Sequence, residues 1–223
     1  MNKTSYTNLS KAWEFTESYA LDEQRAYLQE VRSKVEAQGH EQGSAAQARF
    51  LRMLVGLTNA RSVILVGTAA AVETIEIIDA MHGSGQLTVV DSSSDGAAVI
   101  RSIFNDLDNV SDTRMRVVNA TAGVFLPRLN ADDYDLIVVT GDASNYTATY
   151  QQSSRLLKQG GATVFTDMMG FAAPDSSGGL LNPVDREPKT LELRSLLNLV
   201  ENDEHTESAL IPVGTGMLLT THQ

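Results

Sequence analysis

The stretch Val63-Ile-Leu-Val-Gly-Thr-Ala-Ala-Ala71 decides the fold of this chain. Its apolar half predicts a buried strand, which runs into a turn of small residues and then into an apolar helix over residues 72–81. A second predicted strand, Gln86-Leu-Thr-Val-Val-Asp91, ends in a carboxylate. A strand, a tight turn at a helix N-terminus and an acid at the tip of the next strand are typical of a doubly wound sheet that binds a nucleoside. The turn itself is unusual, because Gly67 is its one glycine and three alanines follow.

Apolar strands alternate with amphipathic helices along most of the chain. Predicted strands cover residues 62–66, 87–90, 115–119, 136–140 and 162–166, and predicted helices lie between them at 72–81, 94–104, 122–129 and 145–157. This alternation predicts an α/β fold in which helices cover both faces of a parallel sheet. After a last helix over 191–202, two apolar runs flank Gly214-Thr-Gly216, which predicts a closing hairpin of two antiparallel strands.

The N-terminal part of the chain has a different pattern. Residues 9–38 predict a single helix, because three apolar residues share one of its faces: Leu28, Val31 and Val35. Polar residues up to Ser44 separate it from the next predicted helix, over 45–57. We therefore divide the chain into an N-terminal helical extension, residues 1–44, and an α/β domain, residues 45–223.

Composition limits the classes of protein and partner. The chain has 223 residues, of which 42% are hydrophobic and 20% charged, as in an ordinary globular protein. A net charge of −11 argues against nucleic acid as a partner. The absence of cysteine excludes disulfides and thiolate metal sites. We find neither a signal peptide nor an apolar run of about 20 residues that would span a membrane, so a cytoplasmic protein without a membrane partner is expected.

One long irregular segment, residues 171–188, is rich in Gly, Ser, Pro and Asp. A loop of this length either binds or covers something, or is disordered, and the sequence leaves both readings open. Trp13 and Tyr19 in the N-terminal helix are expected to make packing or dimer contacts. The histidines lack metal-ligand spacing and are expected on the solvated surface: His40, His82, His205 and His222.

Six short phrases occur in the same order as in one enzyme family. They are Leu65-Val-Gly-Thr68, Leu87-Thr-Val-Val-Asp91, Phe125-Leu-Pro-Arg-Leu129, Tyr134-Asp-Leu-Ile-Val-Val139, Leu156-Leu-Lys-Gln-Gly-Gly161 and Ile211-Pro-Val-Gly-Thr-Gly216. Through them the chain resembles the small bacterial O-methyltransferases related to catechol and caffeoyl-coenzyme A methyltransferases. The resemblance implies a Rossmann-like class I methyltransferase fold with a seven-stranded, mostly parallel sheet. It also implies S-adenosylmethionine as cofactor and a homodimer whose N-terminal helices border the acceptor pocket.

The resemblance also implies a role for each residue that matches the family's cofactor site. In the family the ligand's carboxylate and methionine part lie at the first turn, the ribose on the acid of the second strand, and adenine against the next loop. Those positions are Gly67, Thr68, Ala69 and Ala71, then Asp91 and Ser92, then Thr121 and Ala122, with Thr140 added at the tip of strand 136–140. Each has a simpler alternative. Asp91 could form a turn before Ser92, and the alanines could simply start a helix.

The family's metal site is largely missing from this sequence. Thr140 stands where the family has a metal-binding aspartate, Ala143 where it has a lysine, and Met168 where it has an asparagine. Asp167 alone matches, and a hard divalent cation needs several oxygen ligands. No bound divalent metal is therefore expected. Asp142 and Asp167 are the candidate proton acceptors.

Two functions from different classes fit these residues. The first is an S-adenosylmethionine-dependent O-methyltransferase acting on a small hydroxylated acceptor, in which alignment of the reactants supplies roughly 7–11 kcal/mol without a metal. The second is a catalytically inactive ligand-binding or regulatory protein with the methyltransferase fold, suggested by the losses at Thr140, Ala143 and Met168. A nicotinamide dehydrogenase would leave the closing hairpin unexplained.

Overall fold

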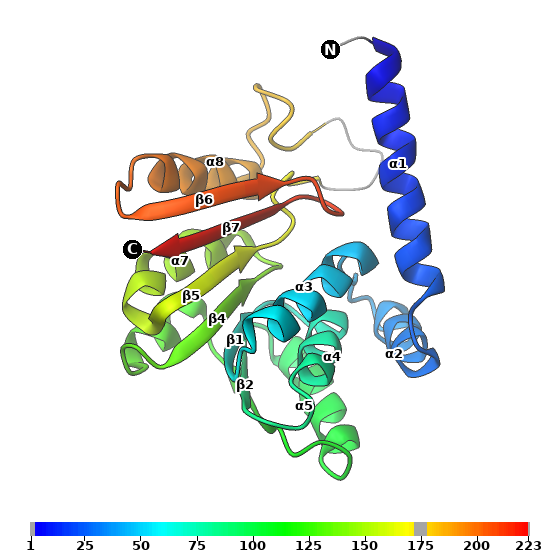
Figure 1. The fold of residues 1–223 in the computed structure, drawn as a ribbon, viewed down its shortest axis with the longest axis vertical. Helices are drawn as coiled ribbons and strands as arrows, with labels where there is room; N and C mark the ends of the chain where they lie inside the picture. The colour runs from blue at the N-terminus through cyan, green and yellow to red at the C-terminus, as the bar shows by residue number, and fades with distance from the viewer. Residues whose placement is uncertain (1–2, 172–177, 223) are drawn as a thin grey trace.

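A twisted sheet with helices on both faces forms the body of the protein (Figure 1). The computed structural model describes residues 3–171 and 178–222. Within these ranges one sheet has seven strands in the order β3-β2-β1-β4-β5-β7-β6. Their bounds are β1 Ser62–Val66, β2 Gln86–Asp91, β3 Arg114–Asn119, β4 Tyr134–Val139, β5 Leu157–Phe165, β6 Thr206–Ile211 and β7 Met217–His222. Strands β1 to β5 pair in parallel, whereas β7 is antiparallel to β5 and β6. The predicted α/β fold with its closing hairpin is confirmed.

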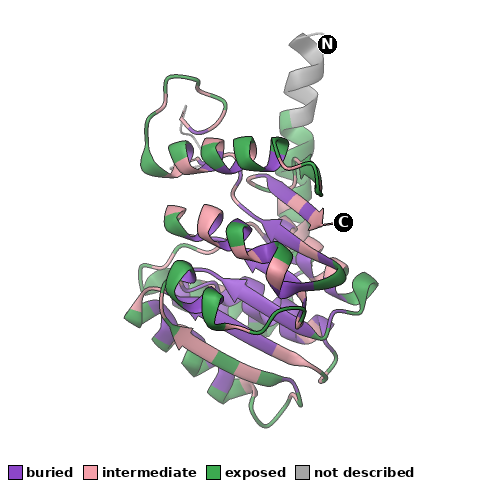
Figure 2. Cartoon of the chain, turned by 90° about the vertical axis from the view of Figure 1, so that its left-hand side faces the viewer, coloured by how far each residue is buried: buried purple, intermediate pink, exposed green. Residues whose placement is uncertain are grey.

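Alternating strand residues divide the interior into two cores. Val63 and Leu65 of β1 face the helices on one side, α2 (Ala26–Ala37), α3 (Ala45–Thr58), α4 (Ala71–Ala80) and α5 (Ser94–Leu107). Ile64 and Val66 face the other side, covered by α6 (Ala122–Phe125), α7 (Tyr146–Leu156) and α8 (Pro188–Glu201). Every residue of β1 is buried, and Figure 2 shows the central strands as a buried layer between the helices, with a more exposed strand at the edge. This double burial explains why β1 is a continuous apolar run.

The N-terminal extension differs from the prediction of one helix over 9–38. The chain forms α1 (Lys3–Asp22) and α2, with Arg25 in an extended conformation between them. The break brings the apolar face of α2 onto the first core, where Leu28 is fully buried. A straight continuation of α1 would point away from that core, since α1 stands apart from the sheet and runs past the end of α3 (Figure 1).

Two other expectations change in detail. The helix predicted over 122–129 is short, because α6 passes into a 3₁₀ turn, η1 (Leu126–Arg128), at Pro127. A second 3₁₀ turn, η2 (Ala143–Asn145), precedes α7. His222 does not lie on the solvated surface as expected: it is half-buried in β7, and its ring bonds the hydroxyl groups of Ser153 and Thr206.

Within the irregular segment 171–188, residues 172–177 lie outside the part of the chain that the structure describes. Its later part, up to α8, is a hydrogen-bonded loop. The backbone N–H of Leu180 donates to the Met169 carbonyl at 2.8 Å, and the guanidinium of Arg194 donates to the carbonyls of Asn182 and Asp185. None of the helices in the described ranges has the length and apolar character that a membrane crossing requires.

Candidate functional site

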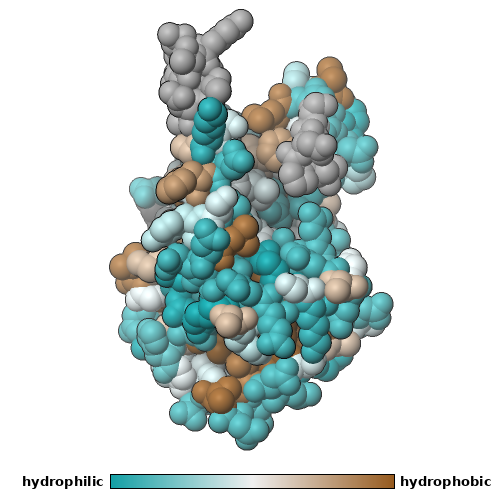
Figure 3. Space-filling view, turned by 90° about the vertical axis from the view of Figure 1, so that its right-hand side faces the viewer, coloured by the Kyte–Doolittle hydropathy of each residue, from teal (hydrophilic) through white to brown (hydrophobic). Residues whose placement is uncertain are grey.

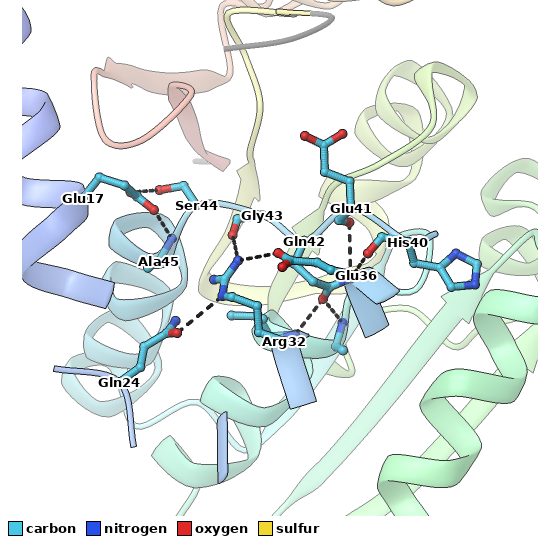
Figure 4. A network of polar contacts seen from close by, with 12 residues as sticks. Glu17, Gln24, Arg32, Glu36, His40, Glu41, Gln42, Gly43, Ser44 and Ala45 are labelled. Carbon is cyan, nitrogen blue, oxygen red and sulfur yellow. Dashed lines mark hydrogen bonds and ion pairs between the residues drawn. The ribbon is translucent and has the colours of Figure 1, made fainter. Parts of the chain in front are cut away.

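A cavity of about 400 Å³ lies at the carboxyl ends of the central strands. Ligands of open α/β sheets bind at this end, where the strand order reverses, and here the reversal falls between β1 and β4. Thr68 follows β1, Thr140 follows β4 and Asp167 follows β5. The loop 39–44 covers the cavity from the N-terminal side (Figure 4). The lining comprises Gly39, His40, Glu41, Gln42, Gly43, Ser44, Thr68, Ala70, Glu73, Thr140, Gly141, Asp167, Phe171, Lys189 and Thr215.

The turn after β1 is closed tightly against its neighbours. A side chain at Gly67 would bring a Cβ within 2.7 Å of the Thr140 methyl group, so the one glycine of the turn is required by space. Ala69 is fully buried and has a φ of 48°, the left-handed conformation that disfavours any residue with a Cβ. The alanine run is therefore more than a helix start, because Ala69 carries a conformational cost.

Asp91 holds this turn in place. Its carboxylate is fully buried and accepts hydrogen bonds from the backbone N–H groups of Ala69 and Ser93, both at 2.8 Å. A Cβ at position 96 would collide with the same carboxylate, so Gly96 leaves it room. Burial raises the pKa of the Asp91 carboxyl, and the two hydrogen bonds oppose that shift. In this conformation Asp91 holds the turn, and its role toward a ribose stays a prediction.

The other predicted adenosine-side residues lie outside the cavity lining. Ser92 donates a hydrogen bond from its hydroxyl to the exposed carboxylate of Asp142 at 3.2 Å. Thr121 is exposed at the start of α6, and Ala122 is buried against the second core. Of the predicted site residues, the cavity brings together Thr68, Thr140 and Asp167.

Gln42 occupies the N-terminus of α4. Its Oε1 accepts the backbone N–H groups of Ala71 and Val72 at 3.1 and 3.3 Å, and its Nε2 donates to the Ala69 carbonyl at 3.0 Å. The first N–H groups of a helix otherwise offer a site for an anion. Sequence reasoning missed this residue, since nothing local indicates that the loop 39–44 reaches over to cap a helix that begins after β1.

Glu73 is the second residue that sequence reasoning missed. It lies in the first turn of α4, where an acidic residue ordinarily favours the helix dipole and faces solvent. Here its side chain lines the cavity, the residue is only 2% exposed, and its Oε2 has no hydrogen-bond partner among the described residues. Burial, reinforced by the negative charge of Asp167, raises the pKa of Glu73 to about 7. The Thr68 hydroxyl, on the same cavity, is also buried without a partner in the described structure.

Both carboxylate oxygens of Asp167 accept hydrogen bonds. Thr140 donates to Oδ2 at 3.1 Å, Thr215 donates to Oδ1, and the Lys189 ammonium lies 3.7 Å from Oδ2. Lys189 also sits over the ring of Tyr146, 5.5 Å from its centroid. Thr140 is thus a hydrogen-bond donor to Asp167.

At the positions where the family binds its metal, the side chains of this chain make other contacts. Met168 is fully buried in the second core. Over the described ranges, no three or more histidine and carboxylate side chains gather in a group that could hold a metal ion. The expectation that no metal binds stays a prediction.

The comparison with known proteins gives the family. The O-methyltransferase family profile matches residues 16–223. This chain belongs to the O-methyltransferase family. It is 30% identical to a candidate O-methyltransferase of Mycobacterium ulcerans (strain Agy99), over 78% of this chain and 74% of that protein. It is 29% identical to a candidate O-methyltransferase of Mycobacterium marinum (strain ATCC BAA-535 / M), over 78% of this chain and 74% of that protein.

Solved structures share the fold of this O-methyltransferase family member. A protein from Corynebacterium glutamicum superposes with a TM-score of 0.79 and 21% identity, covering 95% of this chain and 97% of that one. The O-methyltransferase from Bacillus cereus, solved in complex with SAH, superposes with a TM-score of 0.75 and 19% identity, covering 96% and 99%. These likenesses agree with the sheet order and closing hairpin described above.

Proposed function

We propose that this protein is an S-adenosylmethionine-dependent O-methyltransferase that acts on a small hydroxylated acceptor and works without the family's usual metal site. The observation that carries the proposal is the pair of buried, unpartnered polar atoms, Thr68 Oγ1 and Glu73 Oε2, on one cavity at the strand tips. Buried polar atoms ordinarily have partners, and a ligand in the cavity would supply them. Family membership and the cofactor product seen in the Bacillus cereus neighbour support the same cofactor.

The cofactor would supply an electrophilic methyl group, and this chain's residues would position the acceptor and take its proton. Thr68 and the 67–71 turn would contact the cofactor from β1, next to Thr140 at the tip of β4. Asp167 is the favoured proton acceptor, because its donors fix its orientation at the cavity wall. Asp142, the other candidate, is exposed and bonded to Ser92 outside the lining. We therefore assign the proton to Asp167 ahead of Asp142.

The alternative is a catalytically inactive ligand-binding or regulatory protein, and we do not favour it. The match of the O-methyltransferase family profile over residues 16–223, and of relatives named as O-methyltransferases, favours an enzyme over it.

Calorimetry with S-adenosylmethionine and S-adenosylhomocysteine, followed by a methyl-transfer assay on a panel of catechols and related phenols, tests the proposal. We expect both adenosyl compounds to bind, and transfer to persist when a chelator removes divalent metals. Thr68→Val, which keeps the side-chain shape, is expected to weaken binding by about tenfold because it removes one ligand hydrogen bond. Failure of both compounds to bind at millimolar concentration would refute the proposed cofactor.

We also propose a homodimer built partly on α1. Trp13, Phe15 and Tyr19 are 50%, 69% and 60% exposed on a helix that stands apart from the sheet. The rings of Phe15 and Tyr19 stack with centroids 6.3 Å apart, whereas the face seen in Figure 3 is mostly hydrophilic with separate hydrophobic residues. Light scattering should give the dimer mass for the wild type and the monomer mass after Trp13→Ala, Phe15→Ala and Tyr19→Ala together. A wild-type monomer at micromolar concentration would refute it. A cytoplasmic location, without nucleic-acid or membrane partners, remains part of this proposal.

A further inference from the structure

The wall of the cavity formed by α4 carries an isolated buried carboxyl group. Glu73 is 2% exposed, and no described residue donates to its Oε2. Gly43 lies directly against this side chain, and a Cβ at that position would collide with Oε1. The loop 39–44 therefore closes over Glu73 and leaves the carboxyl group to face the cavity. A buried carboxylate that has no paired cation and one oxygen without a partner is costly, so this arrangement implies a partner that arrives with the ligand.

The nearby cations do not pair with Glu73. Arg32 donates from Nη1 to the Gly43 carbonyl at 2.9 Å and from Nε to Gln24 at 3.3 Å, and it pairs with Glu36 (Figure 4). Its Nη2 is buried without a hydrogen-bond partner in the described part of the chain, and it forms no ion pair with Glu73 there. Lys189 pairs with Asp167.

The remaining charged groups of the lining do not supply a counter-ion either. Asp167 and Glu41 add negative charge, and the ring of His40 points away from Arg32 and Gln42 in Figure 4. Among the described residues, no ion pair forms with Glu73.

The same wall is closed to anions. Gln42 Oε1 already accepts the N–H groups of Ala71 and Val72 at the start of α4. The next polar group along the helix is the Glu73 carboxyl. An incoming carboxylate would therefore meet acceptor oxygens here, whereas an incoming ammonium would find Glu73 Oε2 without a partner.

We propose that Glu73 binds the primary ammonium of the cofactor's amino-acid part, so that this cavity selects adenosyl compounds for their amine rather than for their carboxylate. The inference rests on the proposed function, because it assumes an adenosyl thioether or sulfonium in the cavity. An ammonium carries three N–H donors, which suits a carboxyl oxygen that lacks any partner. An adenosyl compound that keeps the amine and lacks the carboxylate is then a ligand of this protein in its own right.

Calorimetry on the full-length wild type with four thioethers tests the selection. The probes are S-adenosylhomocysteine, its decarboxylated form, its deaminated form and 5′-methylthioadenosine, which lacks the whole amino-acid part. We expect the decarboxylated form to bind within a few fold of S-adenosylhomocysteine, and the deaminated form about 10- to 100-fold more weakly, as for loss of a charged hydrogen bond. This series needs no variant. Equal affinity of the two singly truncated forms, or preference for the deaminated form, would overturn the proposal.

Glu73→Gln then identifies the residue responsible. It should reduce the preference for the amine to a few fold, while Glu41→Gln, the same charge change at an exposed position of the lining, should keep it. A water-mediated structural bridge between Glu73 and Arg32 would give another result: Glu73→Gln would alter stability and leave the ratio of the two affinities unchanged, which refutes a ligand role. Failure of all four probes to bind would refute the proposed function itself, whereas binding without amine selection refutes this inference alone.

Discussion

Replacing Glu73 by glutamine is expected to stabilise the free protein above neutral pH. The pKa of Glu73 rises from 4.5 to about 7 on folding, because the carboxyl group is buried near Asp167. The folded state therefore holds this proton more tightly than the unfolded chain does. The stability that comes with the proton is fully present below pH 4.5 and is lost as the pH rises through 7. At 1.36 kcal/mol per pKa unit, the ionised residue costs the folded state about 3 kcal/mol.

Urea denaturation at pH 5.5 and pH 8.5 measures this cost. We expect the free energy of unfolding of wild type, relative to Glu73→Gln, to fall by about 2 kcal/mol between the two pH values, since part of the effect is already lost at pH 5.5. The comparison between variants removes the pH dependence of all other groups. Glu41→Gln is the matched control, since Glu41 is exposed beside the same cavity and its charge is solvated. A difference between wild type and Glu73→Gln that stays constant over this pH range would refute the reasoning.

Four further predictions follow from single contacts. Ala69→Gly should stabilise the protein by about 1 kcal/mol in thermal or urea unfolding, because φ of 48° suits glycine; a loss of stability would contradict this. Asp91→Ala should destabilise it by about 2 kcal/mol or more, since two backbone N–H groups lose their acceptor, and a neutral effect would show that the turn reorganises. Burial lowers the pKa of His222 below its ordinary value of 6.5, so the neutral ring stabilises the folded state above pH 6.5 and this stability is lost as the pH falls. His222→Gln should therefore reduce the loss of unfolding free energy in acid, and identical pH profiles of the two proteins would argue against it. Asp167→Asn should lower kcat by about 10²- to 10⁴-fold with cofactor affinity within a few fold, and an unchanged kcat would shift the proton to Asp142.

Local sequence patterns were sufficient for the sheet. The apolar run before Gly67 and the alternation that follows it placed β1 to β4 within two residues of their bounds, whereas β5 begins at Leu157, five residues earlier than predicted. The Gly214-Thr-Gly216 turn gave the closing hairpin. The break between α1 and α2 was missed, because the periodicity of 9–38 continues across it and only packing on the first core requires the chain to bend.

The sequence by itself determined which segments are strands and helices, because burial on both sheet faces makes each central strand a short continuous apolar run, whereas the helices between them carry a period of 3.6 residues. It also determined that the polar groups follow the strand tips. The tertiary structure alone decided what those groups do. It turned Asp91 into the acceptor that holds the first turn, set Thr140 beside Asp167, and brought Gly43 over Glu73. The physical reason is that burial and hydrogen-bond partners are properties of contacts between distant segments. From the sequence alone, a glutamate in the first turn of a helix is expected at the surface. Only the tertiary structure shows that the loop 39–44 covers Glu73.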